Sequence, residues 1–196
     1  GIISNNYFEC ESCAYPSPIV RISTDCHNVT FRNNTLVDKS GTSFGLWVNF
    51  DVDPGDNIIV ESNNITGAYY SLGMQRCTNC SVINNYADGL YSLIYEVCYG
   101  TTVINNTFTG EVNVANVLNM RFSGNNMNMF WFIAKRPFAC DNIVDETNTV
   151  QDKAILYVHE DSVTLDSPDE FVVVCGAKNL KLSDYNLSLS VNYCDN

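Results

Sequence analysis

The stretch TTVINNTFTG, residues 101–110, places two adjacent asparagines in a segment rich in β-branched residues. Asn is a poor strand former, so its presence in an otherwise good strand needs a structural reason. The phrase recurs, and aligning its apolar residues gives one template: apolar, any residue, apolar, any two residues, Asn, any residue, apolar. Asn-Asn pairs begin at residues 5, 33, 63, 84, 105 and 125, which indicates a repeated structural unit.

The repeats are spaced as in a solenoid. The Asn slot falls at residues 6, 34, 63, 85, 106, 125 and 148, and Tyr185 fills it in an eighth copy, at intervals of 19 to 37 residues. Periods of this order are typical of solenoids, and the period-2 alternation within each copy predicts strands. Long apolar stripes of period 3.6, which would indicate helices, are nearly absent.

This pattern resembles the short repeats of right-handed parallel β-helices, as found in pectate-lyase-like and NosD-like extracellular proteins. The resemblance covers most of the chain, roughly residues 1–150 and 175–190. It implies an all-β, right-handed parallel β-helix of about eight coils. We expect a single domain over residues 1–196, with irregular last coils over residues 151–196.

The Asn slot has a physical explanation in such a fold. Each coil stacks on the next at about 4.8 Å, so residues at one fixed position form a column. An Asn amide can donate to the Asn on one side and accept from the Asn on the other, which satisfies buried polar groups. Asn also tolerates the left-handed backbone of a sharp bend. The expected ladder residues are Asn6, Asn34, Asn63, Asn85, Asn106 and Asn125.

The second Asn of each pair raises the question of glycosylation. N-x-S/T sequons begin at Asn28, Asn33, Asn64, Asn79, Asn105 and Asn186. Their number is close to chance, but none occupies the ladder slot, and the alternation turns them outward. We therefore expect N-linked glycans at several of them. The alternative is that Asn and Thr are simply abundant turn and edge residues.

Nine cysteines indicate an oxidising, extracellular compartment. Cys77 and Cys98 each lie eight residues before their slot, so they should be stacked neighbours at a spacing that a disulfide can bridge. We expect a Cys77–Cys98 disulfide, and a second between Cys175 and Cys194 that staples the last coil. Stacked free thiols are the alternative, and an odd total leaves at least one cysteine without an intrachain partner.

Two CxxC motifs, Cys10–Cys13 and Cys77–Cys80, invite comparison with a zinc site. Their separation is far longer than in zinc ribbons, and several coils should lie between them. A redox CxxC normally opens a helix, which is not expected here. No metal and no cofactor is therefore expected.

The charge composition narrows the range of partners. The formal net charge is -12 with only 10 Lys and Arg residues, so a nucleic-acid-binding patch is not expected. The most apolar run, MFWFIA at residues 129–134, is too short to span a membrane. We expect an extracellular protein or one on a cell or virion surface.

A catalytic site on the outward face of a sheet is a weaker hypothesis. Reading residues 50–53 as the counterpart of residues 72–75 and 93–96 turns Asp51, Asp53 and Glu96 outward. Asp53 and Glu96 would then lie two coils apart, roughly 10 Å, at the outer limit for an inverting glycosidase pair. Arg76 is the nearby basic candidate. A solvated acidic face is the favoured alternative.

Aromatic residues offer another route to sugar. Stacking on glycans is open to Tyr69, Tyr70, Tyr91, Tyr99 and Trp131, although aromatic columns inside the core are the favoured alternative. The template begins within three residues of the N-terminus and the C-terminal stretch is strand-like, which suggests a fragment of a longer solenoid or end-to-end self-association into a filament.

These observations favour an N-glycosylated structural or adhesive β-helix subunit of a filament or surface layer. The alternative is a carbohydrate-active enzyme or a carbohydrate-binding module acting on polysaccharide.

Overall fold

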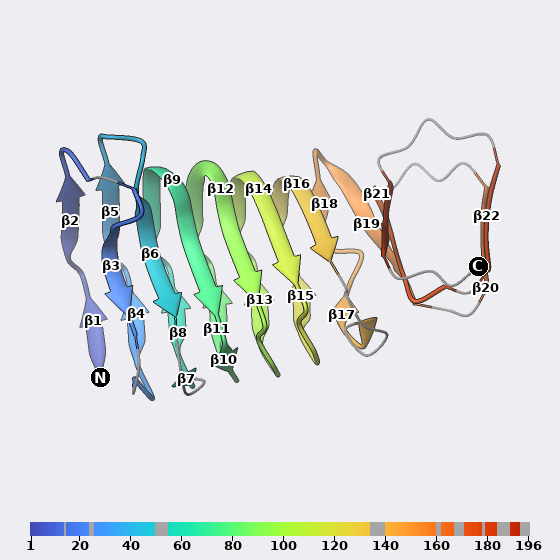
Figure 1. The fold of residues 1–196 in the computed structure, drawn as a ribbon, viewed down its shortest axis with the longest axis horizontal. Coiled ribbons are helices and arrows are strands. Elements are labelled where there is room, and N and C mark those ends of the chain that lie inside the picture. Colours follow the sequence, from blue (N-terminus) through green and yellow to red (C-terminus); the bar gives the residue numbers. More distant parts are fainter. Residues whose placement is uncertain are drawn as a thin grey trace.

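The structure is a computed structural model that describes residues 1–13, 15–23, 26–49, 55–133, 140–159, 162–166, 171–177, 179–183 and 189–192. All the secondary-structure elements in these ranges that are longer than one residue are β-strands. The chain forms a parallel β-solenoid whose coils stack side by side in chain order, from the N-terminus toward the C-terminal strands (Figure 1). The expected all-β, parallel β-helical fold class is confirmed.

One wall of the solenoid is a seven-stranded parallel sheet, made of the short strands that precede the Asn slot. Its strands, in spatial order, are β1 (Ile2–Ser4), β4 (Thr30–Arg32), β8 (Ile59–Glu61), β11 (Ser81–Ile83), β13 (Thr102–Ile104), β15 (Arg121–Ser123) and β17 (Ile143–Val144). A short third side carries β7 (Gly55–Asp56) paired with β10 (Cys77–Thr78).

The opposite wall is a twelve-stranded sheet, called here the long sheet. Its main path contains β2 (Tyr7–Cys10), β5 (Thr35–Asp38), β9 (Asn64–Gln75), β12 (Tyr86–Glu96), β14 (Thr107–Ala115), β16 (Asn126–Ile133), β18 (Thr149–Val150), β19 (Lys153–Val158), β21 (Phe171–Cys175) and β23 (Leu189–Asn192). Two further strands, β3 (Pro18–Ile22) and β6 (Phe44–Asn49), extend it beside the second half of β9.

The apolar positions of the template form the core. Val82 pairs with Val103, and Val103 pairs with Phe122, in exact register across three coils. All three side chains are fully buried, as is Phe108 on the other side of the Asn slot at 1% exposure. The period-2 alternation therefore directs one apolar row from each wall into the space between the sheets.

A hydrogen-bonded Asn ladder runs the length of the coils. The Asn106 Oδ1 accepts from the backbone N of Asn85 at 2.8 Å and from its Nδ2 at 3.0 Å. The Asn106 Nδ2 donates in turn to Asn125 Oδ1 at 2.9 Å and back to the Val82 carbonyl at 2.9 Å. The same contacts link Asn6, Asn34, Asn63, Asn85, Asn106, Asn125 and Asn148.

The left-handed bend lies one residue before the ladder, not on it as we expected. Asn105 has φ of 55°, and its side chain is exposed. Equivalent corner residues, all with positive φ, are Asn5, Asn33, Ser62, Asn84, Asn105 and Gly124. The two asparagines of a pair therefore have separate tasks: the first adopts the turn, for which Asn and Gly are suited, and the second bonds the coils together.

The structure has about five full turns, where we expected about eight. The backbone N of Asn148 bonds to the Asp145 carbonyl of its own turn, and the ladder ends there. Gln151 and Asp152 then both adopt positive φ, and β19 returns antiparallel to β18. Two positive-φ residues joining two antiparallel strands match a type I′ hairpin, which reverses the chain.

The eighth copy of the template consequently lies outside the ladder. Its backbone forms β22 (Asn179–Ser183), which pairs with β20 (Ser162–Asp166) rather than with β17. Tyr185, expected in the Asn slot, lies outside the described residues. Figure 1 shows β20 and β22 beyond the last regular coil.

Candidate functional site

Both tryptophans of the chain lie in one outward-facing row of the long sheet, called here the tryptophan row. Its members are paired in register, in the order Trp47, Gly73, Ile94, Asn113 and Trp131. Residues on both sides of this row along each strand are fully or almost fully buried, so the alternation turns the row outward. Trp131 is 46% exposed.

Gly73 is what allows Trp47 to pack against the sheet. A Cβ at residue 73 would lie only 2.0 Å from Cε3 and from Cζ3 of the indole. The indole therefore occupies the space that any other residue type would fill at position 73. Phe44 supports it from the side, with ring centroids 4.4 Å apart and planes inclined at 61°.

A column of rings runs beside the tryptophan row. Phe44, Tyr70 and Tyr91 come from successive strands and stack nearly parallel, with centroid separations of 4.6 Å and 4.8 Å. These separations match the spacing between coils. Tyr15 covers the free face of Phe44 at 5.8 Å, and Tyr69 meets Tyr70 edge-on at 4.7 Å.

A hollow of about 340 Å³ opens at one end of this column, lined by Tyr15, Thr42, Tyr69 and Tyr70. Burial raises the pKa of the Tyr70 hydroxyl above its usual 10, and the adjacent hydroxyls of Tyr15, Tyr69 and Tyr91 raise it further. Tyr70 is therefore protonated at neutral pH. The hollow presents hydroxyl groups, which can both donate and accept hydrogen bonds.

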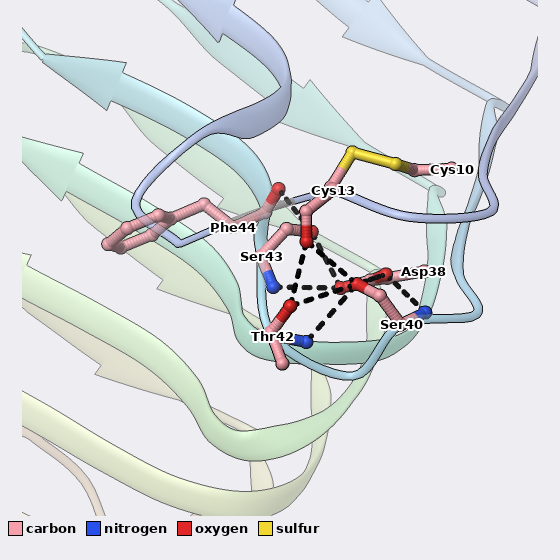
Figure 2. Close-up of a disulfide and its surroundings, with 7 residues drawn as sticks. All are labelled: Cys10, Cys13, Asp38, Ser40, Thr42, Ser43 and Phe44. Atoms are coloured by element: carbon pink, nitrogen blue, oxygen red, sulfur yellow. Dashed lines mark hydrogen bonds between the residues drawn. A yellow bond between two sulfur atoms is a disulfide. The ribbon is translucent and has the colours of Figure 1, made fainter.

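The loop that carries Thr42 is held by a buried carboxylate, as Figure 2 shows. Asp38, 4% exposed, accepts hydrogen bonds from the backbone N and the hydroxyl of Ser40 and of Ser43, at 2.5 to 2.9 Å. Burial alone would raise the pKa of Asp38, but these hydrogen bonds outweigh it and lower the pKa to about 2. The carboxylate thus stays ionised and fixes residues 39–43.

The same loop holds the Cys10–Cys13 disulfide segment. The Cys13 carbonyl lies 2.7 Å from the Thr42 hydroxyl, which donates to it, and 3.0 Å from the Ser40 hydroxyl (Figure 2). Lys39 adds ion pairs to Glu9 and Glu11, although these are solvent-exposed and contribute little.

Both expected disulfides are wrong. Cys77 and Cys98 are stacked as expected, with sulfurs 2.8 Å apart, but they are buried free thiols. Cys175 pairs with Cys140 instead: β19 turns back antiparallel to β18, and β21, which carries Cys175, pairs with β19. Cys194 lies outside the described residues.

The catalytic hypothesis assumed an incorrect register. Gln75 pairs with Asn49 of β6, so the counterpart of residues 72–75 lies four residues earlier than we expected. The Gln75 amide donates to Glu96 at 2.7 Å. Asp51 and Asp53 lie outside the described residues.

The remaining candidates lie elsewhere on the surface. Arg76 has φ of 54° and forms an exposed corner between the long sheet and the short third side. Tyr99 bridges Thr78 and Leu118 on that third side, away from the tryptophan row. Within the described ranges no group of three or more His, Cys, Asp or Glu residues is arranged to hold a metal ion.

Five of the six sequons can be placed, and all five asparagines are exposed. Asn28, Asn33, Asn79 and Asn105 occupy left-handed corners, and Asn64 begins β9. Asn186 lies outside the described residues. None of these five side chains belongs to the tryptophan row or to the hollow beside it.

Sequence reasoning named Tyr69, Tyr70, Tyr91 and Trp131, and the structure brings all four to the outward side of the long sheet. It missed the hollow's other lining residues, Tyr15 and Thr42, together with Phe44 and Trp47. Their strands and loops belong to the longest coils, where the template gives no register. The available signal was the similarity of residues 44–49, FGLWVN, to residues 70–75, YSLGMQ, in which Phe44 corresponds to Tyr70 and Leu46 to Leu72.

No segment in the described part of the chain forms a helix long and apolar enough to cross a membrane. No protein-family model matches the chain. Neither a curated protein nor a solved structure matches it. The parallel β-solenoid agrees with the resemblance to β-helix proteins in its fold, while no match supports a pectate-lyase-like or a NosD-like family.

Proposed function

We propose that this protein is an extracellular adhesive β-solenoid whose tryptophan row binds a neutral glycan. The observation that carries the proposal is the placement of both tryptophans in one outward row, with the column of Phe44, Tyr70 and Tyr91 beside it. Aromatic rings contact the apolar faces of sugars, while phenol hydroxyls and amides bond to sugar hydroxyls.

The dimensions fit a linear oligosaccharide. Trp47 and Trp131 are separated by four strand spacings, roughly 19 Å, which is comparable to a tetrasaccharide. The indole of Trp47 covers Gly73, and Ile94 and Asn113 continue the row toward Trp131 without a charged side chain. The net charge of -12 disfavours an acidic polysaccharide, so a neutral glycan is the better fit.

Binding is better supported than cleavage. Glu96 is hydrogen-bonded to the neutral amide of Gln75, and Asn49 takes the register position that the hypothesis gave to Asp53. The described part of the face therefore does not present the carboxylate pair on which the glycosidase hypothesis depended.

We also propose an extracellular location and N-linked glycans, and the disulfides and the exposed sequons support both. Two disulfides favour an oxidising compartment, and the asparagines of the five described sequons are exposed, four at left-handed corners and Asn64 at the start of β9. Glycans at these positions would leave the tryptophan row uncovered.

Self-association is a second candidate function, supported by the exposed edge at the N-terminal strands. Among the described residues, β1 pairs with β4 at the edge of its sheet, and Ile2 and Tyr7 on β1 and β2 are 65% and 62% exposed. An edge of this kind favours pairing with another strand. A light-scattering mass that rises with concentration would support self-association, and a constant monomer mass would contradict it.

The glycan proposal is tested by equilibrium binding to cello-, malto-, manno- and xylotetraose, with oligogalacturonate as the acidic comparison. We expect a neutral tetrasaccharide to bind and Trp131→Ala to weaken binding about tenfold, which corresponds to ~1.4 kcal/mol. Ile143→Ala is the matched control, because Ile143 is a 62% exposed apolar residue on the opposite wall. Failure of every neutral glycan to bind, or equal loss in both variants, would contradict the proposal.

A further inference from the structure

We propose that the hollow between Tyr15, Thr42, Tyr69 and Tyr70 is a pocket for a single neutral sugar residue. We further propose that the Cys10–Cys13 disulfide holds in place the outer wall of this pocket, which is formed by Tyr15. This inference rests on the proposed function, since the pocket adjoins the tryptophan row through the column of Phe44, Tyr70 and Tyr91. It adds the feature that selects among neutral glycans.

The chemistry of the lining points to a sugar. Three phenol groups and one threonine hydroxyl line the hollow, and no Asp, Glu, His, Lys or Arg is among its described lining residues. Its volume of about 340 Å³ lies at the small end of the ~300–1,000 Å³ range for ligand sites, as suits one ring of a larger ligand. Hydroxyls that donate and accept match sugar hydroxyls, whose orientation differs between hexoses.

The outer wall has little support of its own. Tyr15 is 61% exposed, and its ring is held by stacking on Phe44 at 5.8 Å and by a tilted contact with Tyr70 at 6.3 Å. Two residues earlier, the Cys13 carbonyl is bonded to the Thr42 hydroxyl at 2.7 Å. Tyr15 and Thr42 are therefore positioned together through Cys13.

The disulfide limits how far that attachment can move. Cys10 ends β2, which pairs in register with β5, and Asp38 at the end of β5 fixes the loop carrying Thr42. Figure 2 shows the disulfide beside this hydrogen-bonded loop. Breaking the disulfide frees Cys13 from Cys10, and the wall is then held only by the hydroxyl contacts to Cys13 and the ring contacts of Tyr15.

The Cys10–Cys13 bond is the more accessible of the two disulfides in the described part of the chain. Glu11 and Ser12 between its cysteines are exposed, whereas Cys140 and Cys175 are fully buried. A dithiol such as dithiothreitol therefore attacks Cys10–Cys13 first. The reagent's two thiols supply two electrons and two protons, which yields the thiols of Cys10 and Cys13 and the cyclic disulfide of the reagent.

The experiment compares the full chain before and after mild dithiothreitol treatment, with alkylation and peptide mass analysis confirming modification of Cys10 and Cys13 but not of Cys140 and Cys175. Binding is measured for the four neutral tetrasaccharides named above. We expect reduction to weaken the tightest of them at least fivefold and to narrow the differences among the four. Variants extend the test: the double variant Cys10→Ser/Cys13→Ser should behave like reduced protein, and Ser12→Ala like oxidised protein.

Two further variants distinguish the role of the pocket from the role of the tryptophan row. Tyr15→Phe keeps the ring and removes the hydroxyl, so it should reduce discrimination among hexoses while circular dichroism stays unchanged. Trp131→Ala should weaken all four ligands without changing their ranking. If oxidised protein binds none of them, the proposed function and this inference both fail. If binding depends on Trp131 but affinity and ranking are the same in oxidised and reduced protein, only the present inference is overturned.

Discussion

Replacing each asparagine of one pair separately tests the division of labour between the ladder and the corner. In Asn106→Ala, the buried Asn85 backbone N–H loses its acceptor, and the amide bonds to Val82 and Asn125 disappear. An orphaned buried donor costs roughly 2 kcal/mol and the lost amide bonds about 1 kcal/mol more, so we expect a loss of ~3 kcal/mol in the free energy of unfolding.

The neighbouring substitution should behave differently. Asn105 is exposed with φ of 55°, so Asn105→Ala should cost only about 1 kcal/mol, the penalty of an ordinary side chain in the left-handed region. Asn105→Gly should cost nothing or stabilise slightly.

Urea unfolding followed by circular dichroism measures the three values on unglycosylated protein, so that loss of the Asn105 sequon has no effect. Equal losses for Asn106→Ala and Asn105→Ala, or a loss below about 1 kcal/mol for Asn106→Ala, would refute the reasoning.

Three further predictions concern single side chains. Gly110→Ala should destabilise the protein by about 3 kcal/mol or prevent folding, because its Cβ would lie 1.8 Å from the Gly89 carbonyl oxygen; urea unfolding measures this, and a neutral result would contradict the close stacking. Gly73→Ala should displace the indole of Trp47, which would change the tryptophan emission spectrum and weaken neutral glycan binding; an unchanged spectrum would contradict the packing. The lowered pKa of Asp38 makes its contribution, about 2 kcal/mol, complete above the usual carboxyl value of 3.8 and lost as the pH falls through about 2. Asp38→Asn should therefore lose stability at pH 7 and show a smaller fall between pH 4 and pH 2 in thermal unfolding, whereas parallel curves would contradict this role.

The fold was predictable because the repeat has a physical cause that is visible in the sequence. A polar residue recurring between buried apolar positions must be satisfied by its own copies, and Asn106 between Val103 and Phe108 shows the pattern clearly. The same pattern could not show which residue of the pair adopts positive φ, because Asn suits both tasks.

The end of the solenoid was not predictable from the repeat. Gln151 and Asp152 take the left-handed conformations that usually mark Gly or Asn, so the reversal between β18 and β19 lacks its usual sequence signal. That reversal also sets the pairing of Cys140 with Cys175. A disulfide hypothesis based on coil register alone could not include it.

The candidate site was predictable only in part. Trp131 falls in a regular coil, where alternation reveals its direction. Tyr70 and Tyr91 have the same parity as the buried Leu72 and Leu93, and alternation fails for them because Ser71 and Ser92 are buried as well. Phe44 and Trp47 follow the loop fixed by Asp38, whose length shifts the register by four residues from the one we expected. The hollow depends on that loop and on the disulfide segment, so it emerges only from the three-dimensional arrangement.

The most direct test of the central claim is intrinsic tryptophan fluorescence during titration with the neutral tetrasaccharides, because Trp47 and Trp131 are the two tryptophans of the chain and both belong to the proposed binding row. Single-tryptophan variants, Trp47→Phe and Trp131→Phe, assign the signal. We expect a saturable change in emission from both residues with one shared dissociation constant. If a neutral glycan binds by calorimetry but leaves the tryptophan emission spectrum unchanged, the binding site lies elsewhere. That result would contradict the proposed role of the tryptophan row.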